Sequence, residues 1–592
     1  MKNYLSLFLI LAISITYSQE KKGNEKAKDT IKTEVVNVVT SYVPKITDAF
    51  KIKQKPIIKH TKNTEKKALQ YQIFSVPVAS TFIPKSGVMK KVDLGKKERL
   101  YDNYFSVGLG NKFTPFLEAY VRQSENYNSE LGAGLKFLLS SNPVENTALN
   151  STFYNIDVNL FYTQHERYFS WTAGVDAARN KYNWYGLPTK ITFTDATISN
   201  IEEAQNYNDF KVFGKINPTD SFIKEGNLSI NYFSDSHESN EFLIDGNVEF
   251  QFPLNNFNRQ LNDLHLNTTA SYVGSNFATD YQTKTPIKAS FFTFGVHPNY
   301  KFNVQDLAIQ IGAKTYFSLD IENSQNNFFV YPDVEVSYPL IKEVANLFVG
   351  ATGDITTNSY QSLTQNNPYV SPTQNILQTN TKFDAFTGIR GKLNHQFSYN
   401  FKASYATIEN NPFYALNPSK SDGTTIAGTD GFTFSGYEYG NSFSVEYDDV
   451  KRLSFFGEIA FDGIKNLTIG ANGQFNKFTL TNSTELWNTP KIKGEIFGTY
   501  KTHKWFAGAN FYFLGQRKGK NYDVLPDQTF TTIDLDGYFD INFNSGYHFN
   551  DAFSAFLNLN NVLNNNYQQF TNFNVQGFQA MAGLTWKFDS LF

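Results

Sequence analysis

The sequence predicts an all-β fold, namely a transmembrane, antiparallel β-barrel of about 22 strands preceded by an extended basic N-terminal segment. Three observations predict it. The chain opens with an apolar export signal, and from residue 101 onward it alternates in polarity in segments of about 9–15 residues. Aromatic residues make up 16% of the chain and crowd the ends of those segments.

The composition excludes several other classes of protein. No apolar run approaches the ~18 residues that a membrane-spanning helix needs, which argues against a helical membrane protein. The chain has no cysteine, which excludes disulfide scaffolds, thiolate metal sites and cysteine nucleophiles. The aromatic content also argues against general disorder, because disordered chains are poor in aromatics.

Residues 1–18 are predicted to form a cleaved signal peptide. Lys2 supplies the positive charge, residues 5–15 form the apolar stretch, and small residues precede Gln19. An amphipathic N-terminal helix is the alternative, but no polar face interrupts the apolar stretch. The mature protein is therefore expected to leave the cytoplasm and reach the outer membrane of a Gram-negative cell.

Residues 19–100 are predicted to be a basic extended segment. They contain 19 Lys and Arg against 8 Asp and Glu, so they carry +11, whereas residues 101–592 carry −14. The β-branched run 34–40 suits the addition of a strand to another protein's sheet edge, and a strand within this chain is the alternative. Its candidate partner-binding residues are Glu34, Val35, Val36, Val38 and Val39.

Residues 101–592 are predicted to form the barrel, since each segment has one apolar and one polar face. The clearest segment places Leu584 and Trp586 on one face and Thr585 on the other. Soluble sandwiches show the same alternation, but these segments are longer than typical soluble strands and suit a tilted transmembrane strand. The aromatics that we assign to interfacial girdles are Tyr162, Tyr168, Phe169, Trp171, Tyr182, Trp184, Tyr185, Trp505, Phe506, Trp586 and Phe588.

Acidic residues on the polar faces are expected to line the barrel lumen. Together they would attract cations, although each alone can equally be an ordinary solvated residue. We therefore hypothesise that the basic segment runs into or across the lumen. The lumen-facing set is Asp157, Asp245, Glu249, Asp333, Glu335, Glu458, Asp462, Asp534, Asp536 and Asp540.

The C-terminal strands resemble a known family. Residues 538–542, 556–568 and 580–588 resemble the last three strands of TonB-dependent receptors, whose penultimate strand ends in an Asn-Leu-hydrophobic-Asn-x-x-Tyr-like signature. Asn560, Leu563 and Tyr567 match that signature, and the terminal strand closes on Phe588. The resemblance is closest to barrels from the Bacteroidota and is weaker over the rest of the barrel region.

This resemblance implies a 22-stranded barrel, a folded plug and a TonB box that pairs with TonB. The run 34–40 looks like a TonB box, either working or vestigial. The sequence departs from the family because residues 41–100 are too few and too polar for the plug. We therefore expect a barrel that lacks most or all of the plug.

No motif predicts a catalytic, metal or cofactor site, and an enzyme is not expected. The histidines are dispersed, and neither a nucleophile elbow nor a phosphate-binding loop is present. The segment 181–188 is a second candidate for recognition, through aromatic stacking on a sugar or peptide, and residues 417–440 are expected to form a mobile loop.

Two functions compete. The first is transport of a solute across the outer membrane, or service as an accessory barrel of an outer-membrane complex. The second is a purely structural scaffold of an outer-membrane assembly or secretion machinery. The expected partners are outer-membrane lipid, TonB, and other outer-membrane or periplasmic proteins; nucleic acid is not expected.

Overall fold

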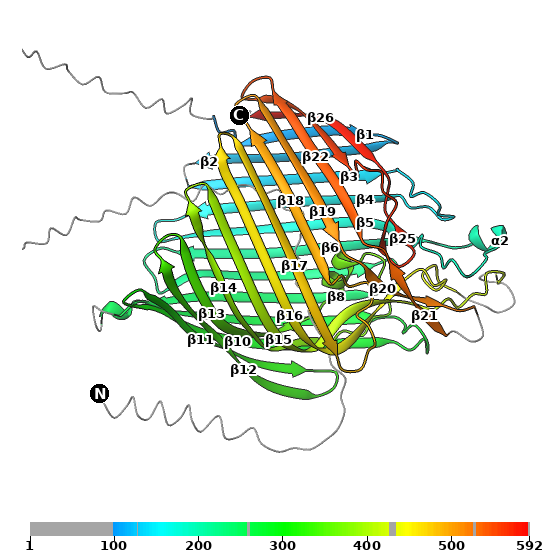
Figure 1. Ribbon diagram of the computed structural model, residues 1–592, viewed down its shortest axis with the longest axis horizontal. Helices are drawn as coiled ribbons and strands as arrows, with labels where there is room; N and C mark the ends of the chain where they lie inside the picture. The colour runs from blue at the N-terminus through cyan, green and yellow to red at the C-terminus, as the bar shows by residue number, and fades with distance from the viewer. Residues whose placement is uncertain (1–98, 127, 257–260, 426–433, 525–528, 590–592) are drawn as a thin grey trace, which may run out of the picture. The chain divides into compact units, whose positions relative to one another are not determined.

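A closed sheet of 22 strands forms the main body of the described part of the chain. The computed structural model describes residues 99–592 except 127, 257–260, 426–433, 525–528 and 590–592. The sheet closes because β1 (Asn103–Gly110) pairs antiparallel with both β2 (Thr114–Asn126) and β26 (Gln579–Phe588). The predicted fold class and strand number are therefore confirmed (Figure 1).

The other elements follow in chain order. The remaining barrel strands are β3 (Ser129–Ser140), β4 (Phe153–His165), β5 (Phe169–Asn183), β6 (Ala204–Pro218), β7 (Ile223–Asp235), β8 (Asn240–Phe252), β9 (Leu264–Phe277), β10 (Ile287–Val304), β11 (Leu307–Asp320), β12 (Gln325–Ile341), β13 (Ala345–Thr357), β14 (Gln378–Asn394), β15 (Phe397–Leu416), β16 (Phe443–Ile464), β17 (Leu467–Leu480), β18 (Ile492–Lys501), β19 (Trp505–Leu514), β22 (Tyr538–His548) and β23 (Phe553–Asn560). Outside the barrel sheet lie α2 (Asp195–Ile198), η1 (Leu254–Asn256), α3 (Tyr360–Asn366), and two small hairpins, β20 (Arg517–Tyr522) with β21 (Phe530–Leu535) and β24 (Gln568–Phe570) with β25 (Phe573–Asn574).

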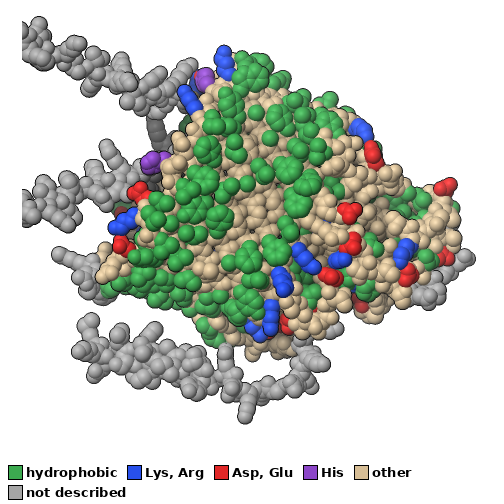
Figure 2. Space-filling model, viewed as in Figure 1, with side chains coloured by type: hydrophobic (Ala, Val, Ile, Leu, Met, Phe, Trp, Pro, Cys, Tyr) green, Lys and Arg blue, Asp and Glu red, His purple; other side chains and the backbone are tan. Residues whose placement is uncertain are grey.

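The outer face of the barrel is apolar. On β26, Leu584 and Trp586 are exposed, and the partner residue of Leu584 on β1 is Val107, which is exposed as well. Strand side chains alternate between the two faces, so the residues between these point into the lumen. Figure 2 shows hydrophobic side chains spread over the strands, whereas charged side chains gather toward the two ends of the barrel.

The two ends of the barrel differ in the length of their connections. One end carries tight turns such as 305–306, 395–396 and 465–466, with the connection 253–263 as an exception. The other end carries the long connections 184–203, 358–377, 417–442, 515–537 and 561–578. Short turns face the periplasm and long loops face outward in outer-membrane barrels, so we name the long-loop end the outer mouth (Figure 1).

The turn at 465–466 illustrates how sequence permits such tight connections. Asn466 has a φ of 66°, the left-handed conformation that asparagine tolerates better than most residues. The adjacent strands β16 and β17 can therefore pair almost up to the turn, from Ile464 with Leu467 onward.

Exposed aromatic residues lie at the end of the barrel that carries the tight turns. Tyr168, Phe169, Trp505 and Trp586 are exposed there, at the ends or beginnings of barrel strands. Amphipathic rings of this kind favour the boundary between lipid and water. The exposure and strand-end positions of these four residues are those that the girdle prediction requires.

Candidate functional site

Five loops from different strand pairs of the ring meet at the outer mouth and pack into one cluster, which we call the cap. It comprises the described residues of the loops 141–152, 184–203, 358–377, 417–442 and 561–578. Each loop joins two neighbouring strands, but the strand pairs lie at different places around the barrel, so the cap spans the mouth. Its aromatic core consists of Trp184, Tyr185, Tyr369, Phe443, Phe570 and Phe573.

Ring stacking holds the centre of the cap together. Tyr369 stacks on Phe573 with ring centroids 3.9 Å apart, and Tyr185 lies 4.9 Å from the same Phe573 ring. Phe443, at the start of β16, lies 5.6 Å from it. Such pairs add about 0.5–1.5 kcal/mol each to the free energy gained by burying their area.

Side-chain hydrogen bonds to backbone carbonyls tie the loops to one another. Trp184 is fully buried, and its Nε1 donates to the Tyr369 carbonyl at 3.2 Å. Asn441 Nδ2 donates to the Trp184 carbonyl at 2.7 Å, and the Tyr185 hydroxyl donates to the Asn574 carbonyl at 2.7 Å. Three of the long loops are therefore bridged through two adjacent residues of a fourth.

The helix α3 descends from the cap and is anchored on the barrel wall. Ser359 caps its N-terminus. The fully buried Glu241 of β8 accepts hydrogen bonds from the backbone N–H groups of Tyr360, at 2.6 Å, and Gln361, at 3.1 Å. The Tyr360 hydroxyl donates to Asp235 at 2.8 Å. These contacts hold the 358–377 loop inside the mouth.

One sequence prediction about this region is wrong, and a second does not hold for the described residues. Trp184 and Tyr185 lie in the buried core of the cap rather than in a girdle or a free stacking surface. Tyr182 likewise packs against a buried cluster around Tyr360. The described residues of the 417–440 loop include deeply buried side chains such as Tyr439, so this part of the loop is packed. Aromatic residues at a strand end predict burial or a girdle equally well, and only tertiary contacts separate the two.

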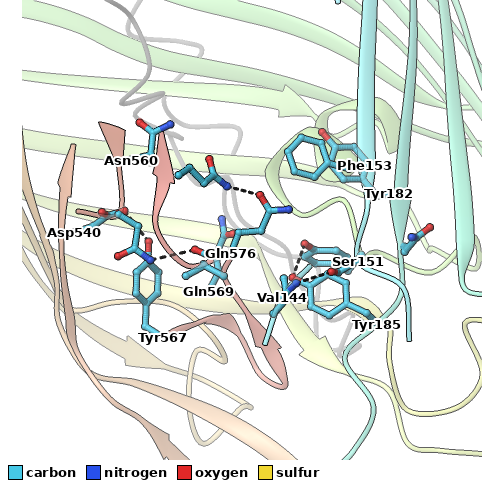
Figure 3. A pocket seen from close by; sticks show the side chains of 15 residues that line it. Val144, Ser151, Phe153, Tyr182, Tyr185, Asp540, Asn560, Tyr567, Gln569 and Gln576 are labelled. Atoms are coloured by element: carbon cyan, nitrogen blue, oxygen red, sulfur yellow. Dashed lines mark hydrogen bonds between the residues drawn. The ribbon is translucent and has the colours of Figure 1, made fainter. Parts of the chain in front are cut away.

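A cavity of about 250 Å³ lies between the cap and the wall formed by β4, β5, β22, β23 and β26. Figure 3 shows Asp540 and Tyr567 on one side of it and Phe153, Tyr182 and Tyr185 on the other, with Gln576 between them. The Tyr567 hydroxyl donates to Asp540 Oδ2 at 2.8 Å. The cavity thus combines amide, aromatic and carboxylate groups.

Most of the predicted lumen acids lie on the lumen side of barrel strands. The alternation with exposed apolar neighbours points Asp157, Asp245, Glu249, Asp333, Glu335, Glu458 and Asp540 inward. Asp462 lies at the periplasmic end of β16, beside a register irregularity.

Asp534 and Asp536 are placed differently from the rest of that set. Asp534 lies in β21, in the small hairpin outside the barrel sheet, where it pairs with Lys518. Asp536 lies in the connection between β21 and β22. The alternating pattern of 530–536 is that of a strand, but a local pattern does not distinguish a barrel strand from a loop hairpin.

Basic side chains interleave with the lumen acids, a feature that sequence reasoning missed. Glu335 pairs with Arg390 at 2.9 Å, and Asp157 of β4 lies directly across from Lys136 of β3. Lys314 pairs with Asp354 at 3.1 Å. The lumen wall is therefore a mosaic of both charges rather than a uniformly acidic surface.

The remaining predicted residues, Glu34, Val35, Val36, Val38 and Val39, lie outside the described residues, as do the proposed signal peptide and almost all of the basic segment. Within the described ranges, no helix is long and apolar enough to cross a membrane. No group of three or more His, Asp or Glu residues is positioned to hold a metal ion in that same part of the chain.

Comparisons with known proteins agree with this architecture. No family model and no curated protein matches the sequence. Among solved structures, the chain is similar to the FrpB iron transporter from Neisseria meningitidis, with a TM-score of 0.60 and 9% identity over 83% of this chain and 82% of that one.

Two further solved structures are similar to this chain. The ferripyoverdine receptor of the outer membrane of Pseudomonas aeruginosa gives a TM-score of 0.58 at 13% identity, over 83% of this chain and 72% of that one. The siderophore receptor PirA from Acinetobacter baumannii gives 0.60 at 10% identity, over 82% and 80%. At such identities the likeness shows the fold, and this chain has the 22-stranded barrel fold of outer-membrane receptors.

Proposed function

We propose that this protein is an outer-membrane barrel that passes a solute through its lumen, with the cap as the gate at the outer mouth. The observation that carries this proposal is the cap itself. It spans a lumen lined with polar side chains, and it is held by aromatic stacking and hydrogen bonds. Because the sequence contains no cysteine, no disulfide locks it, and a closure of this kind can open and reseal.

The sequence supplies the finer parts of the proposal. Residues 1–18 direct export, the barrel lacks most or all of a plug, residues 19–100 run into or across the lumen, and the run 34–40 pairs with TonB. The resemblance to TonB-dependent receptors of the Bacteroidota supports these assignments, as do the transport and receptor roles named for the similar structures. No catalytic role is assigned.

Ion conductance in planar bilayers tests the gate. Trp184→Ala combined with Tyr369→Ala removes the tie between two cap loops, and KCl conductance should rise severalfold above that of the natural chain. Trp505→Ala, which removes an exposed girdle ring, is the matched control and should not change conductance. Both changes are repeated in a chain that lacks residues 19–100, because the hypothesis that the basic segment crosses the lumen predicts a further rise there.

Equal conductance in all these variants would contradict the proposal that the cap is a gate. Flux of glucose into liposomes that carry the cap variant then measures solute passage directly.

A pull-down with the periplasmic domain of TonB tests the run 34–40. Val36→Pro should abolish capture, because proline removes an N–H that strand pairing needs.

A scaffold function is the second candidate, and the complete burial of Trp184, Tyr360 and Phe573 in the cap favours it. A permanently closed barrel would offer a rigid docking surface to other outer-membrane proteins. Native purification in mild detergent separates the two functions. Stoichiometric partners together with no ion current support the scaffold, whereas a lone barrel with current supports the transporter.

A further inference from the structure

The cavity beneath the cap presents hydrogen-bond acceptors that lack donors. Asn183 is 3% exposed, and its Nδ2 donates to the Thr152 carbonyl at 3.1 Å while its Oδ1 has no partner within the described structure. Asp540 Oδ1 is also buried and without a partner there, although its Oδ2 is engaged by Tyr567. Buried acceptors of this kind lose free energy unless a donor reaches them.

The charge of the cavity has one sign. Among the described residues that line the cavity, Asp540 is the one carboxylic acid, and none is Lys, Arg or His. Asp540 forms no ion pair among the described residues. Other lumen carboxylates are engaged by basic or amide side chains, as Glu335 is by Arg390 and Asp333 is by Asn299 and Gln310. Among the described residues, the lining of the cavity therefore holds one carboxylate without a basic partner.

Tyrosine rings form much of the rest of the lining. Tyr567 stacks on Tyr538 with centroids 3.7 Å apart, which fixes the orientation of the hydroxyl that holds Asp540. Tyr182 and Tyr185 lie across the cavity from this pair (Figure 3). Aromatic faces attract cations through the ring quadrupole, so both sides of the cavity favour positive charge.

We infer that the cavity binds a small organic cation with N–H donors, an aliphatic amine whose ammonium group donates to Asp540 while its other end reaches Asn183 and the tyrosine faces. Free acceptors select a ligand that brings donors, and the unpaired carboxylate selects positive charge over a neutral polyol. A volume of about 250 Å³ admits a short linear diamine. Small organic amines would then be the class of solute that the barrel transports, so this inference rests on the proposed function. Its test, however, measures binding alone.

Isothermal titration of the full chain in detergent provides the test, with 1,5-diaminopentane as the probe and 1,5-pentanediol as its uncharged match. The diamine should bind and the diol should not. Asp540→Asn should weaken diamine binding at least tenfold, because it removes the charge at nearly constant shape. Asp157→Asn removes one lumen carboxylate outside the cavity and should leave binding unchanged.

Asn560→Asp provides a second variant that does not depend on the folding of the first. Asn560 lines the cavity and is exposed, so a carboxylate there should tighten diamine binding severalfold. Absence of diamine binding, equal binding of the diol, or equal weakening by Asp540→Asn and Asp157→Asn would each overturn the inference. If the cap variants conduct but the diamine does not bind, this inference fails while the proposed transport stands.

Discussion

Tyr369 and Phe573 stack 3.9 Å apart at the centre of the cap, although they belong to the β13–β14 and β23–β26 loops on different sides of the barrel. Their contact joins two loops that share no strand pairing. The closure of the outer mouth therefore depends on side chains whose loss should open the cap without breaking the barrel sheet.

Phe573→Ala should loosen the cap locally. Phe573 is fully buried, and truncation of a buried phenylalanine typically costs about 3–5 kcal/mol. Hydrogen exchange should accelerate in the loops 358–377 and 561–578 and remain slow in the barrel strands. Phe549→Ala, at a position 59% exposed in a periplasmic turn, is the control. Uniform acceleration in the strands as well would show that the cap and the barrel unfold together.

Glu241→Gln should release α3. The carboxylate accepts hydrogen bonds from Tyr360 and Gln361, and the amide of glutamine would turn a donor toward one of those N–H groups. A buried N–H group that loses its acceptor costs about 1–3 kcal/mol, so exchange of residues 360–366 should quicken by about one to two powers of ten. Glu145→Gln, in an exposed part of the cap, should change nothing. If α3 stays protected in Glu241→Gln, the Tyr360–Asp235 contact is its main anchor.

The turn after Ser421 should be acid-sensitive. Hydrogen bonds from the Thr424 backbone and side chain, and then from Thr425, lower the pKa of Asp422 to about 2. A carboxyl group whose pKa is depressed by folding stabilises the turn above its unfolded pKa of about 3.9, and that stabilisation is lost as pH falls through about 2.

The protection factors of residues 422–425 against hydrogen exchange should therefore fall between pH 4 and pH 2. The Gly423 carbonyl accepts from Thr194 and Thr197, so the segment at α2 should loosen with it. Asp422→Asn should show the loosened turn already at neutral pH, whereas Asp551→Asn in a periplasmic turn should not. A pH response that survives in Asp422→Asn would assign it to another group.

The barrel could be predicted from the sequence because its signal is local. Leu584, Thr585 and Trp586 alternate between lipid and lumen with a period of two, so the polarity of each residue indicates the face of the sheet on which it lies. The same rule placed Asp540 inward. Asp534 obeys the rule too, yet it belongs to a loop hairpin. Alternation indicates that a segment is a strand, but it does not indicate which sheet contains that strand.

The cap could not be predicted in this way. Trp184 and Trp505 both stand at an end of a barrel strand, yet Trp184 is fully buried and Trp505 is 56% exposed. The difference arises from contacts with Tyr369, Asn441 and Tyr437, which are remote in sequence. The sequence likewise does not predict that the Oδ1 atom of Asn183 lacks a hydrogen-bond partner within the described structure. That depends on where the folded loops place their donors.

Arg517 should pin the small hairpin β24–β25 to β20. It is 3% exposed, and its two terminal nitrogens donate to the carbonyls of Gln568 and Gln569. Burial lowers the pKa of its guanidinium, so these two carbonyls and the Tyr538 ring, 5.4 Å away, must compensate the charge.

Arg517→Met should leave both carbonyls without that donor, at about 1–3 kcal/mol for each unsatisfied group. Arg517→Lys should fall between the natural chain and Arg517→Met, because a single ammonium cannot reproduce the planar fork of the guanidinium. Protease cleavage within 567–575 should follow that order. Arg167→Met, in an exposed turn at the opposite end of the barrel, supplies the baseline. Cleavage of Arg517→Met at that baseline rate would mean that Phe570 and Phe573 fix the hairpin without Arg517.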